Sequence, residues 1–134
     1  MRIQAAEPVS LHLSLASVTG PELLQRTQFY KVGHHGSHNA TLRALGLEQM
    51  TSEDLIAFVP VFKAQAVKNR WLEMPFEPLV KRLKEKTGGR LVFSDPAQKA
   101  PDSASLDTLS AKQRKAFIEG LTEDPLYYEY SIKL

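Results

Sequence analysis

The chain has 134 residues, of which 43% are hydrophobic and 24% are charged, and its formal net charge is +2. This composition is typical of one compact domain, here residues 1–134, and the weak charge does not by itself indicate a nucleic-acid partner. Cysteine is absent, which excludes disulfides, thiolate metal ligands and a cysteine nucleophile. The sequence contains no apolar run long enough to span a membrane, so we expect a soluble, cytoplasmic protein without a membrane partner.

Near the amino terminus, the segment Val9–Leu15 alternates between apolar and polar residues, which predicts a half-buried strand rather than a signal peptide. The segment 19–22 (Thr-Gly-Pro-Glu) is typical of a helix start and predicts a short helix that carries Leu23 and Leu24. Residues Gln28–Val32 form a second strand candidate, which ends at a glycine.

The middle of the chain alternates between predicted helices and strands. Residues 40–50 (ATLRALGLEQM) predict a helix that is interrupted or capped at Gly46. The short apolar run Asp54–Pro60 suits a strand that is buried on both faces of a sheet.

The next segment carries the clearest helical pattern. Its apolar residues follow an i, i+3, i+4, i+7 spacing between Pro75 and Gly88-Gly89: Phe76, Leu79, Val80 and Leu83. A further buried strand is expected at Arg90–Asp95. The order strand, helix, strand, helix, strand predicts an α/β fold with layers of sheet and helix.

The last third of the chain begins with a polar, proline-containing loop over residues 96–105. A capping-box pattern at 110–113 predicts a helix that ends at Gly120. Residues 126–134 (LYYEYSIKL) alternate cleanly and predict a terminal strand at a sheet edge, with Tyr127 on its exposed side.

Three of the four histidines lie in one glycine-rich loop: His34, His35 and His38. Imidazole is the commonest neutral metal ligand near pH 7, and loops after strands often carry such ligands. Gly33 and Gly36 let the backbone turn sharply and approach an ion. His34 and His35 are adjacent, so at most one of them is expected on a given ion. The alternative interpretation is a polar surface loop.

A catalytic zinc needs about three protein ligands and an open position for water. This loop is not expected to supply all three. His12 is the only other histidine, so carboxylates would have to complete the set.

The stretch YKVGHHGSHNATL resembles the Lys-Val-x-His-His-Gly-Ser segment of the metallo-β-lactamase superfamily. The similarity is to the branch that includes the hydrolase domains of DNA-internalisation competence proteins. DLIAFVPV and RWLEMPFEPLVKRLKEKTGGRLVFSD are similar to the C-terminal part of bacterial members of that branch. The resemblance extends over roughly Leu23 to Asp95.

The resemblance implies an αββα sandwich in which one or two zinc ions activate a water molecule for hydrolysis. It implies that His34 binds the metal, with His35 as the alternative ligand. It also implies that His35 and His38 lie beside the reacting centre and that Ser37 lines the substrate site.

Two motifs of the family are missing from the sequence. The main metal motif, His-x-His-x-Asp-His, is absent, and so is the Gly-Asp pair expected some two dozen residues before the histidine pair. The chain therefore resembles the C-terminal half of such a hydrolase, and we expect a partial metallo-β-lactamase-like domain with an incomplete zinc site.

Three functions are compatible with the sequence. The first is a metal-dependent hydrolase, or its C-terminal part, with phosphodiesters as the favoured substrates. The second is a catalytically incompetent α/β module that binds a partner or forms homo-oligomers through an uncovered sheet. The third is a small basic nucleic-acid-binding domain, because residues 61–90 hold eight basic and three acidic side chains.

Overall fold

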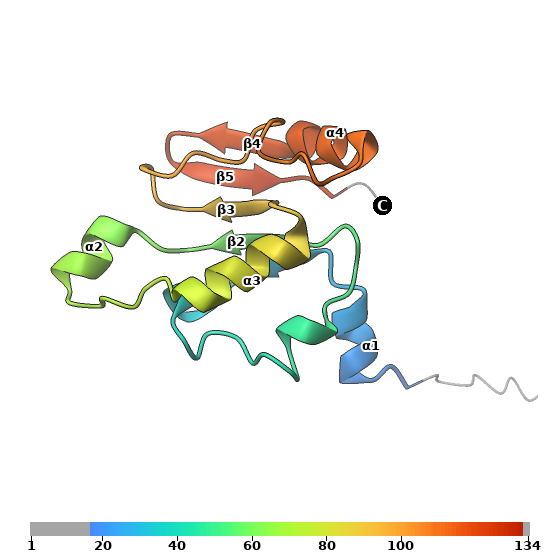
Figure 1. The fold of residues 1–134 in the computed structure, drawn as a ribbon, viewed down its shortest axis with the longest axis horizontal. Helices are drawn as coiled ribbons and strands as arrows, with labels where there is room; N and C mark the ends of the chain where they lie inside the picture. The colour runs from blue at the N-terminus through green and yellow to red at the C-terminus, as the bar shows by residue number, and fades with distance from the viewer. Residues whose placement is uncertain (1–16, 133–134) are drawn as a thin grey trace, which may run out of the picture.

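A computed structural model describes residues 17–132, and the strand predicted at Val9–Leu15 lies outside them. The centre of the fold is a parallel sheet in the order β1-β2-β3 (Figure 1). Its strands are β1 (Phe29–Lys31), β2 (Ile56–Val59) and β3 (Leu91–Phe93). The described residues pair β1 only with β2, whereas β2 pairs on both sides. The mixed α/β character predicted from the sequence is confirmed.

A short helix, α1 (Gly20–Gln25), precedes β1 as predicted. The Thr19 hydroxyl accepts a hydrogen bond from the Glu22 backbone N–H, and the Glu22 carboxylate accepts from the Thr19 backbone in return. This capping box satisfies two N–H groups that the first helical turn leaves without partners. The hydrogen bonds that begin this helix thus join residues only three positions apart.

The helix predicted over residues 40–50 is wrong, because only a 3₁₀ turn, η2 (Leu47–Gln49), forms there. The Leu47 and Glu48 N–H groups donate to the carbonyls of residues five positions earlier, at 2.8 and 2.9 Å. Such bonds describe a wider turn than an α-helix. Gly46 is non-helical, with φ −137° and ψ −90°. The turn buries Leu47 while Leu42 and Leu45 stay exposed.

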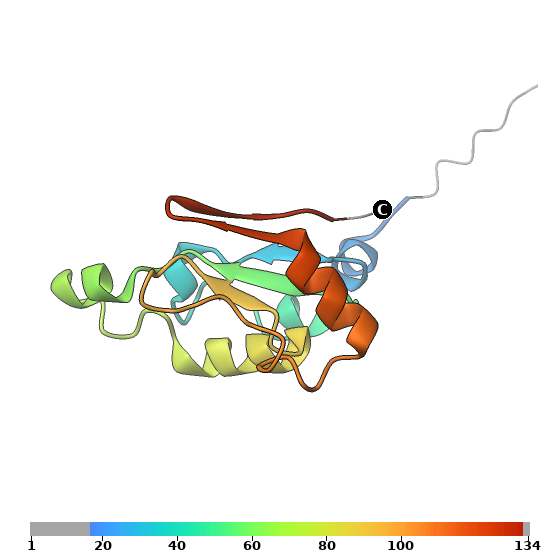
Figure 2. The same ribbon diagram turned by 90° about the horizontal axis from the view of Figure 1, so that it is seen from above.

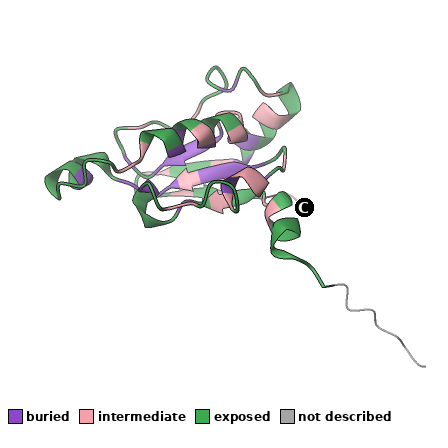
Figure 3. Ribbon diagram, turned by 60° about the horizontal axis from the view of Figure 1, so that its bottom comes forward, coloured by how far each residue is buried: buried purple, intermediate pink, exposed green. Residues whose placement is uncertain are grey.

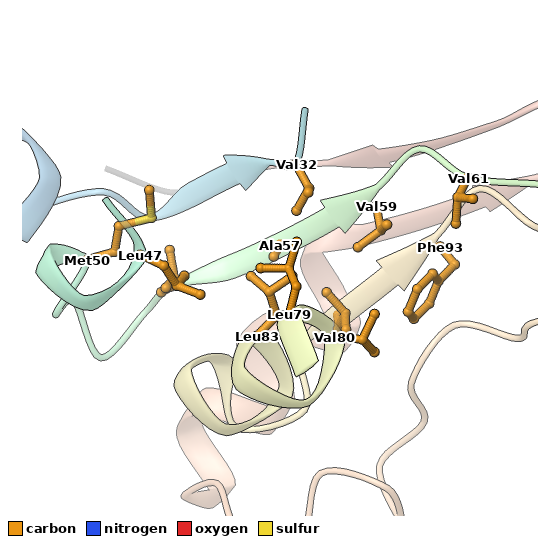
Figure 4. Close-up of a cluster of buried hydrophobic side chains, with 12 residues drawn as sticks. Val32, Leu47, Met50, Ala57, Val59, Val61, Leu79, Val80, Leu83 and Phe93 are labelled. Atoms are coloured by element: carbon orange, nitrogen blue, oxygen red, sulfur yellow. The ribbon is translucent and has the colours of Figure 1, made fainter. Parts of the chain in front are cut away.

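One face of the sheet is covered by α3 (Glu77–Thr87), which begins and ends as predicted. Its side chains Leu79, Val80 and Leu83 point toward sheet residues that include Ala57 and Val59 (Figure 4). The helix ends at Gly88, whose φ of 59° lies in the left-handed region that glycine adopts without strain. This cluster is the main hydrophobic core.

The opposite face of the sheet is covered by α4 (Ala111–Gly120) and a hairpin (Figure 2). The Ser110–Gln113 capping box forms as predicted. The hairpin joins β4 (Leu121–Asp124) to β5 (Tyr127–Tyr130) in a separate antiparallel pair. The terminal strand was therefore predicted in the right place, but its partner β4 was not predicted. A second core cluster lies under these elements: Ile56, Val92, Leu106 and Phe117.

The fold thus has three layers, with the buried strands enclosed between α3 and the α4–hairpin layer (Figure 3). The polar loop at 96–105 contains turns, without helix or strand, as expected. A further short helix, α2 (Lys63–Lys68), projects beyond the carboxyl end of β2 (Figure 1). Within residues 17–132, no helix is both long and apolar enough to cross a membrane.

An ion-pair cluster connects η2 to α3. The Arg82 guanidinium donates two hydrogen bonds to the Glu48 carboxylate, at 2.8 and 2.6 Å. This interaction is the main reason that the pKa of Glu48 falls from its ordinary value of 4.5 to about 2. Lys86 and Arg43 lie at 3.8 and 3.7 Å from the same carboxylate.

We expect Glu48→Gln to destabilise the protein at neutral pH and to have little effect in strong acid. A carboxylate with a lowered pKa stabilises the fold above its unfolded-state pKa, and this contribution is lost as pH falls from about 4.5 toward 2. The effect is modest because both side chains are partly exposed. Urea unfolding of both proteins across this pH range measures the difference, which should close in acid. The control Glu119→Gln removes only an exposed pair with Lys115 and should change stability little.

Candidate functional site

The histidine loop (residues 33–39) leaves the carboxyl end of β1 and begins with a single 3₁₀ turn, His34–Gly36. Three successive residues of this turn have left-handed backbone angles: φ is 45° at His34, 53° at His35 and 72° at Gly36. For a residue with a Cβ atom this conformation costs about 1–2 kcal/mol. Backbone strain of this kind concentrates at functional sites, where the surrounding structure maintains it.

The strained turn is held against the segment that precedes α3. The Phe76 N–H donates to the Gly36 carbonyl at 2.7 Å. Gly36 is buried, and a Cβ atom at its position would lie 3.2 Å from both Pro75 and Val59. Only a glycine can approach this surface so closely, and it places the two preceding histidines at the edge of the sheet.

His34 is oriented by two polar neighbours within the loop. Its Nδ1 lies 3.0 Å from the Ser37 Oγ and 3.1 Å from the Asn39 Oδ1. Because the Ser37 hydroxyl donates its own hydrogen to Asn39, both oxygens act as acceptors for His34. The Nδ1 therefore acts as the donor, which leaves Nε2 as the ring atom with no partner inside the loop. Ser37 is buried, and its contact with a substrate stays a prediction.

His35 is oriented by a different part of the chain. Its Nδ1 donates to the Pro60 carbonyl at 2.8 Å, so here too Nε2 is the ring nitrogen left for another contact. The ring is stacked on Trp71 with centroids 5.9 Å apart and planes 17° apart. The rings of His35 and Trp71 line a small cavity of about 210 Å³ at the carboxyl ends of the strands. Trp71 therefore packs against His35 and supports the orientation of its ring.

His38 lies in a different environment from His35. Its ring lies edge-on to Phe76, with centroids 6.3 Å apart, in a second cavity of about 370 Å³ beside α3. Leu47 and Leu79 contribute apolar surface to this cavity, whereas Lys81 contributes charge. The structure therefore places His38 in a different cavity from His35, and the reacting-centre role predicted for both stays a prediction.

The described residues contain no complete metal site. Among residues 17–132, no three His, Cys, Asp or Glu side chains lie close enough together to hold a metal ion. His12, the fourth histidine of the sequence, lies outside this range. The donors that are described fit a single zinc contact, through the Nε2 of His34 or of His35.

Sequence reasoning did not identify Asp95, a buried carboxylate at the carboxyl end of β3. Its two oxygens accept hydrogen bonds from the backbone N–H groups of Lys63 and Ala97, at 3.0 and 2.9 Å. It therefore connects the start of α2 to the edge of the sheet where the histidine loop lies. An aspartate two residues after a buried strand was the available signal.

The eight basic side chains of residues 61–90 fall into two groups in the structure. Arg82 and Lys86 belong to the Glu48 cluster, and Arg90 is buried. The other five basic side chains are exposed: Lys63, Lys68, Arg70, Lys81 and Lys84. Three of these five lie on or just after α2, the helix that contributes Gln65 and Ala66 to the cavity of His35 and Trp71.

Comparison of the chain with protein-family models, curated proteins and solved structures finds no match.

Proposed function

We propose that the histidine loop is the metal-facing part of a metal-dependent hydrolase of the metallo-β-lactamase type. The observation that carries this proposal is the state of the two rings, because His34 and His35 each donate Nδ1–H to a protein oxygen. Metal-ligating histidines almost always donate their second N–H in this way, which leaves Nε2 for the ion. The strained backbone of the turn supports the same interpretation.

The proposal places one imidazole of this chain on the metal and the remaining ligands outside residues 17–132. A catalytic zinc requires about three protein ligands, and the described residues do not assemble such a set. We propose that the three-layer fold is related to the C-terminal half of the αββα sandwich.

Phosphodiesters are the substrate class that we favour for this site. Exposed Lys63, Lys68 and Arg70 lie on or just after α2, a helix that also lines the cavity of His35 and Trp71. Residues 61–72 carry no acidic side chain, so this segment attracts anions. The same charge distribution is the remaining support for nucleic-acid binding.

The test is the zinc content of the purified full chain after dialysis against micromolar zinc, measured by inductively coupled plasma mass spectrometry. We expect bound zinc in the natural sequence and at least a tenfold loss of affinity in either His34→Ala or His35→Ala. His38→Ala is the matched control, because its ring lies in a separate cavity. Zinc binding that is absent, or unchanged in both loop variants, would refute the proposal.

A self-associating module is the second candidate, and an exposed part of the sheet favours it. Phe29 on β1 is 38% exposed although its ring packs edge-on against Phe58 at 5.1 Å. Within the described residues the outer edge of β1 has no strand partner, and such edges recruit further strands.

Light scattering on zinc-free samples measures this association. We expect the mass to rise from 15.0 kDa toward twice that value with concentration, and Phe29→Ser to prevent the rise. A monomer at every concentration would exclude this candidate.

A further inference from the structure

A cavity of about 380 Å³ lies at the opposite end of the sheet from the histidine loop. Its lining includes Gln28, Asp54 and Arg90, which come just before β1, β2 and β3. The three strands are parallel, so these residues mark the amino edge of the sheet, whereas His34 follows its carboxyl edge. The cavity is therefore separate from the site proposed for metal binding. On its other side it is lined by α4 and by the residues at the end of β5.

Arg90 gives this cavity its charge. The side chain is only 4% exposed, and its guanidinium donates to two backbone carbonyls, those of Thr87 and Glu53. No carboxylate of residues 17–132 lies within ion-pairing distance of it. Burial lowers the pKa of Arg90, and the charge of Asp54 opposes this shift without contacting the group. A buried cation without a contacting counter-ion favours the binding of an anion.

Two lysines of α4 add to this charge. Lys112 and Lys115 are one helical turn apart, and both line the cavity with Arg90. The acidic groups in the lining are Asp54 and Glu119, and Glu119 pairs at 3.7 Å with Lys115 in an exposed arrangement. The lining therefore carries three cationic and two acidic side chains, which leaves a net charge of +1.

We propose that this cavity binds a phosphate monoester, with Arg90, Lys112 and Lys115 around the phosphate. A guanidinium has five N–H donors, and the two hydrogen bonds to Thr87 and Glu53 leave donors for an anion. A phosphate monoester carries close to two negative charges at neutral pH, whereas a ligand with one carboxylate carries a single charge. The phosphate is therefore the better match for a site with three cationic side chains. Tyr130 and Ile132 also line the cavity and offer apolar surface to the organic group.

The two carbonyl hydrogen bonds of Arg90 also connect the end of α3 to the loop before β2. This structural role accounts for two of its N–H groups, but it does not account for the lysines that face the same cavity. A test must therefore change the lysines and leave the Arg90 hydrogen bonds intact.

The experiment is a titration of the ¹⁵N-labelled full chain with inorganic phosphate and with phenyl phosphate, followed by nuclear magnetic resonance. Sodium chloride at matched ionic strength is the reference. We expect saturable shifts at the side-chain amides of Gln28 and Gln113, with phenyl phosphate binding more tightly than inorganic phosphate. The double variant Lys112→Gln/Lys115→Gln should weaken binding by about tenfold or more, because each charge-assisted hydrogen bond contributes strongly.

The control variant Lys84→Gln/Lys99→Gln removes the same charge from residues that line a different cavity. It should bind phenyl phosphate as the natural sequence does, and so should His34→Ala, which separates this site from the zinc proposal. Shifts that do not saturate, that sodium chloride reproduces, or that weaken equally in the control variant would overturn the proposal.

Discussion

Replacing Leu83 with alanine is expected to lower the free energy of unfolding by about 2–5 kcal/mol. Leu83 is 0% exposed and lies on the face of α3 that packs against the sheet, in the cluster that contains Ala57 (Figure 4). Truncation removes buried methyl groups and leaves a cavity that a packed helix and sheet cannot close. Urea unfolding followed by circular dichroism gives the free energy directly.

The matched control for this change is Leu126→Ala. Leu126 is 92% exposed, in the turn between β4 and β5, so the same chemical change should alter the free energy of unfolding by less than about 0.5 kcal/mol. Equal effects of the two substitutions would show that α3 does not pack on the sheet as described.

Replacing Gly36 with alanine is expected to destabilise the protein by about 1–3 kcal/mol and to weaken any zinc binding by the histidine loop. The φ of Gly36 is +72°, a left-handed conformation that is costly for alanine. The added Cβ atom would also lie 3.2 Å from Pro75 and Val59, so one of these neighbours must move. Moving them disturbs the hydrogen bond from Phe76 that holds the turn.

Gly33→Ala is the control for this prediction, because the two glycines flank the same pair of histidines. Gly33 has a φ of −76°, which alanine adopts readily, and a Cβ atom there would meet its nearest neighbour at 3.7 Å. We expect little change in thermal unfolding or zinc content for Gly33→Ala. If both variants behaved alike, the close approach of Gly36 to its neighbours would not be what positions the loop.

The helices and strands that the sequence predicted correctly are those whose signals are local. The capping boxes at Thr19 and Ser110 need only four neighbouring residues, and the pattern of α3 repeats within a few turns. The burial of β2 followed from its continuous apolar run, which is typical of a strand covered on both faces of the sheet.

The errors occurred where distant contacts decide the conformation. Residues 40–50 have helix-forming composition, but Glu48 is held by Arg82, a residue 34 positions later. The burial of Leu47 against α3 and the non-helical angles of Gly46 determine the turn. β4 was missed because its short segment LTED carries no strand pattern and is defined by pairing with β5.

The candidate site divides in the same way. The sequence alone identified the histidine loop, the glycines that shape it and the strand that precedes it, because these features are adjacent along the chain. It also determined the α/β class through the order of its apolar patterns. The tertiary structure alone placed Pro60 and Trp71 beside His35 and turned His38 toward α3.

The cavity around Arg90 likewise depends on tertiary structure, because α4 and the amino edge of the sheet line it together. Periodicity records which side of a helix or strand is buried, because burial repeats with the backbone. Contacts between side chains of different helices and strands depend on packing between residues far apart in the chain. Local sequence patterns do not record these contacts, so only the folded molecule shows them.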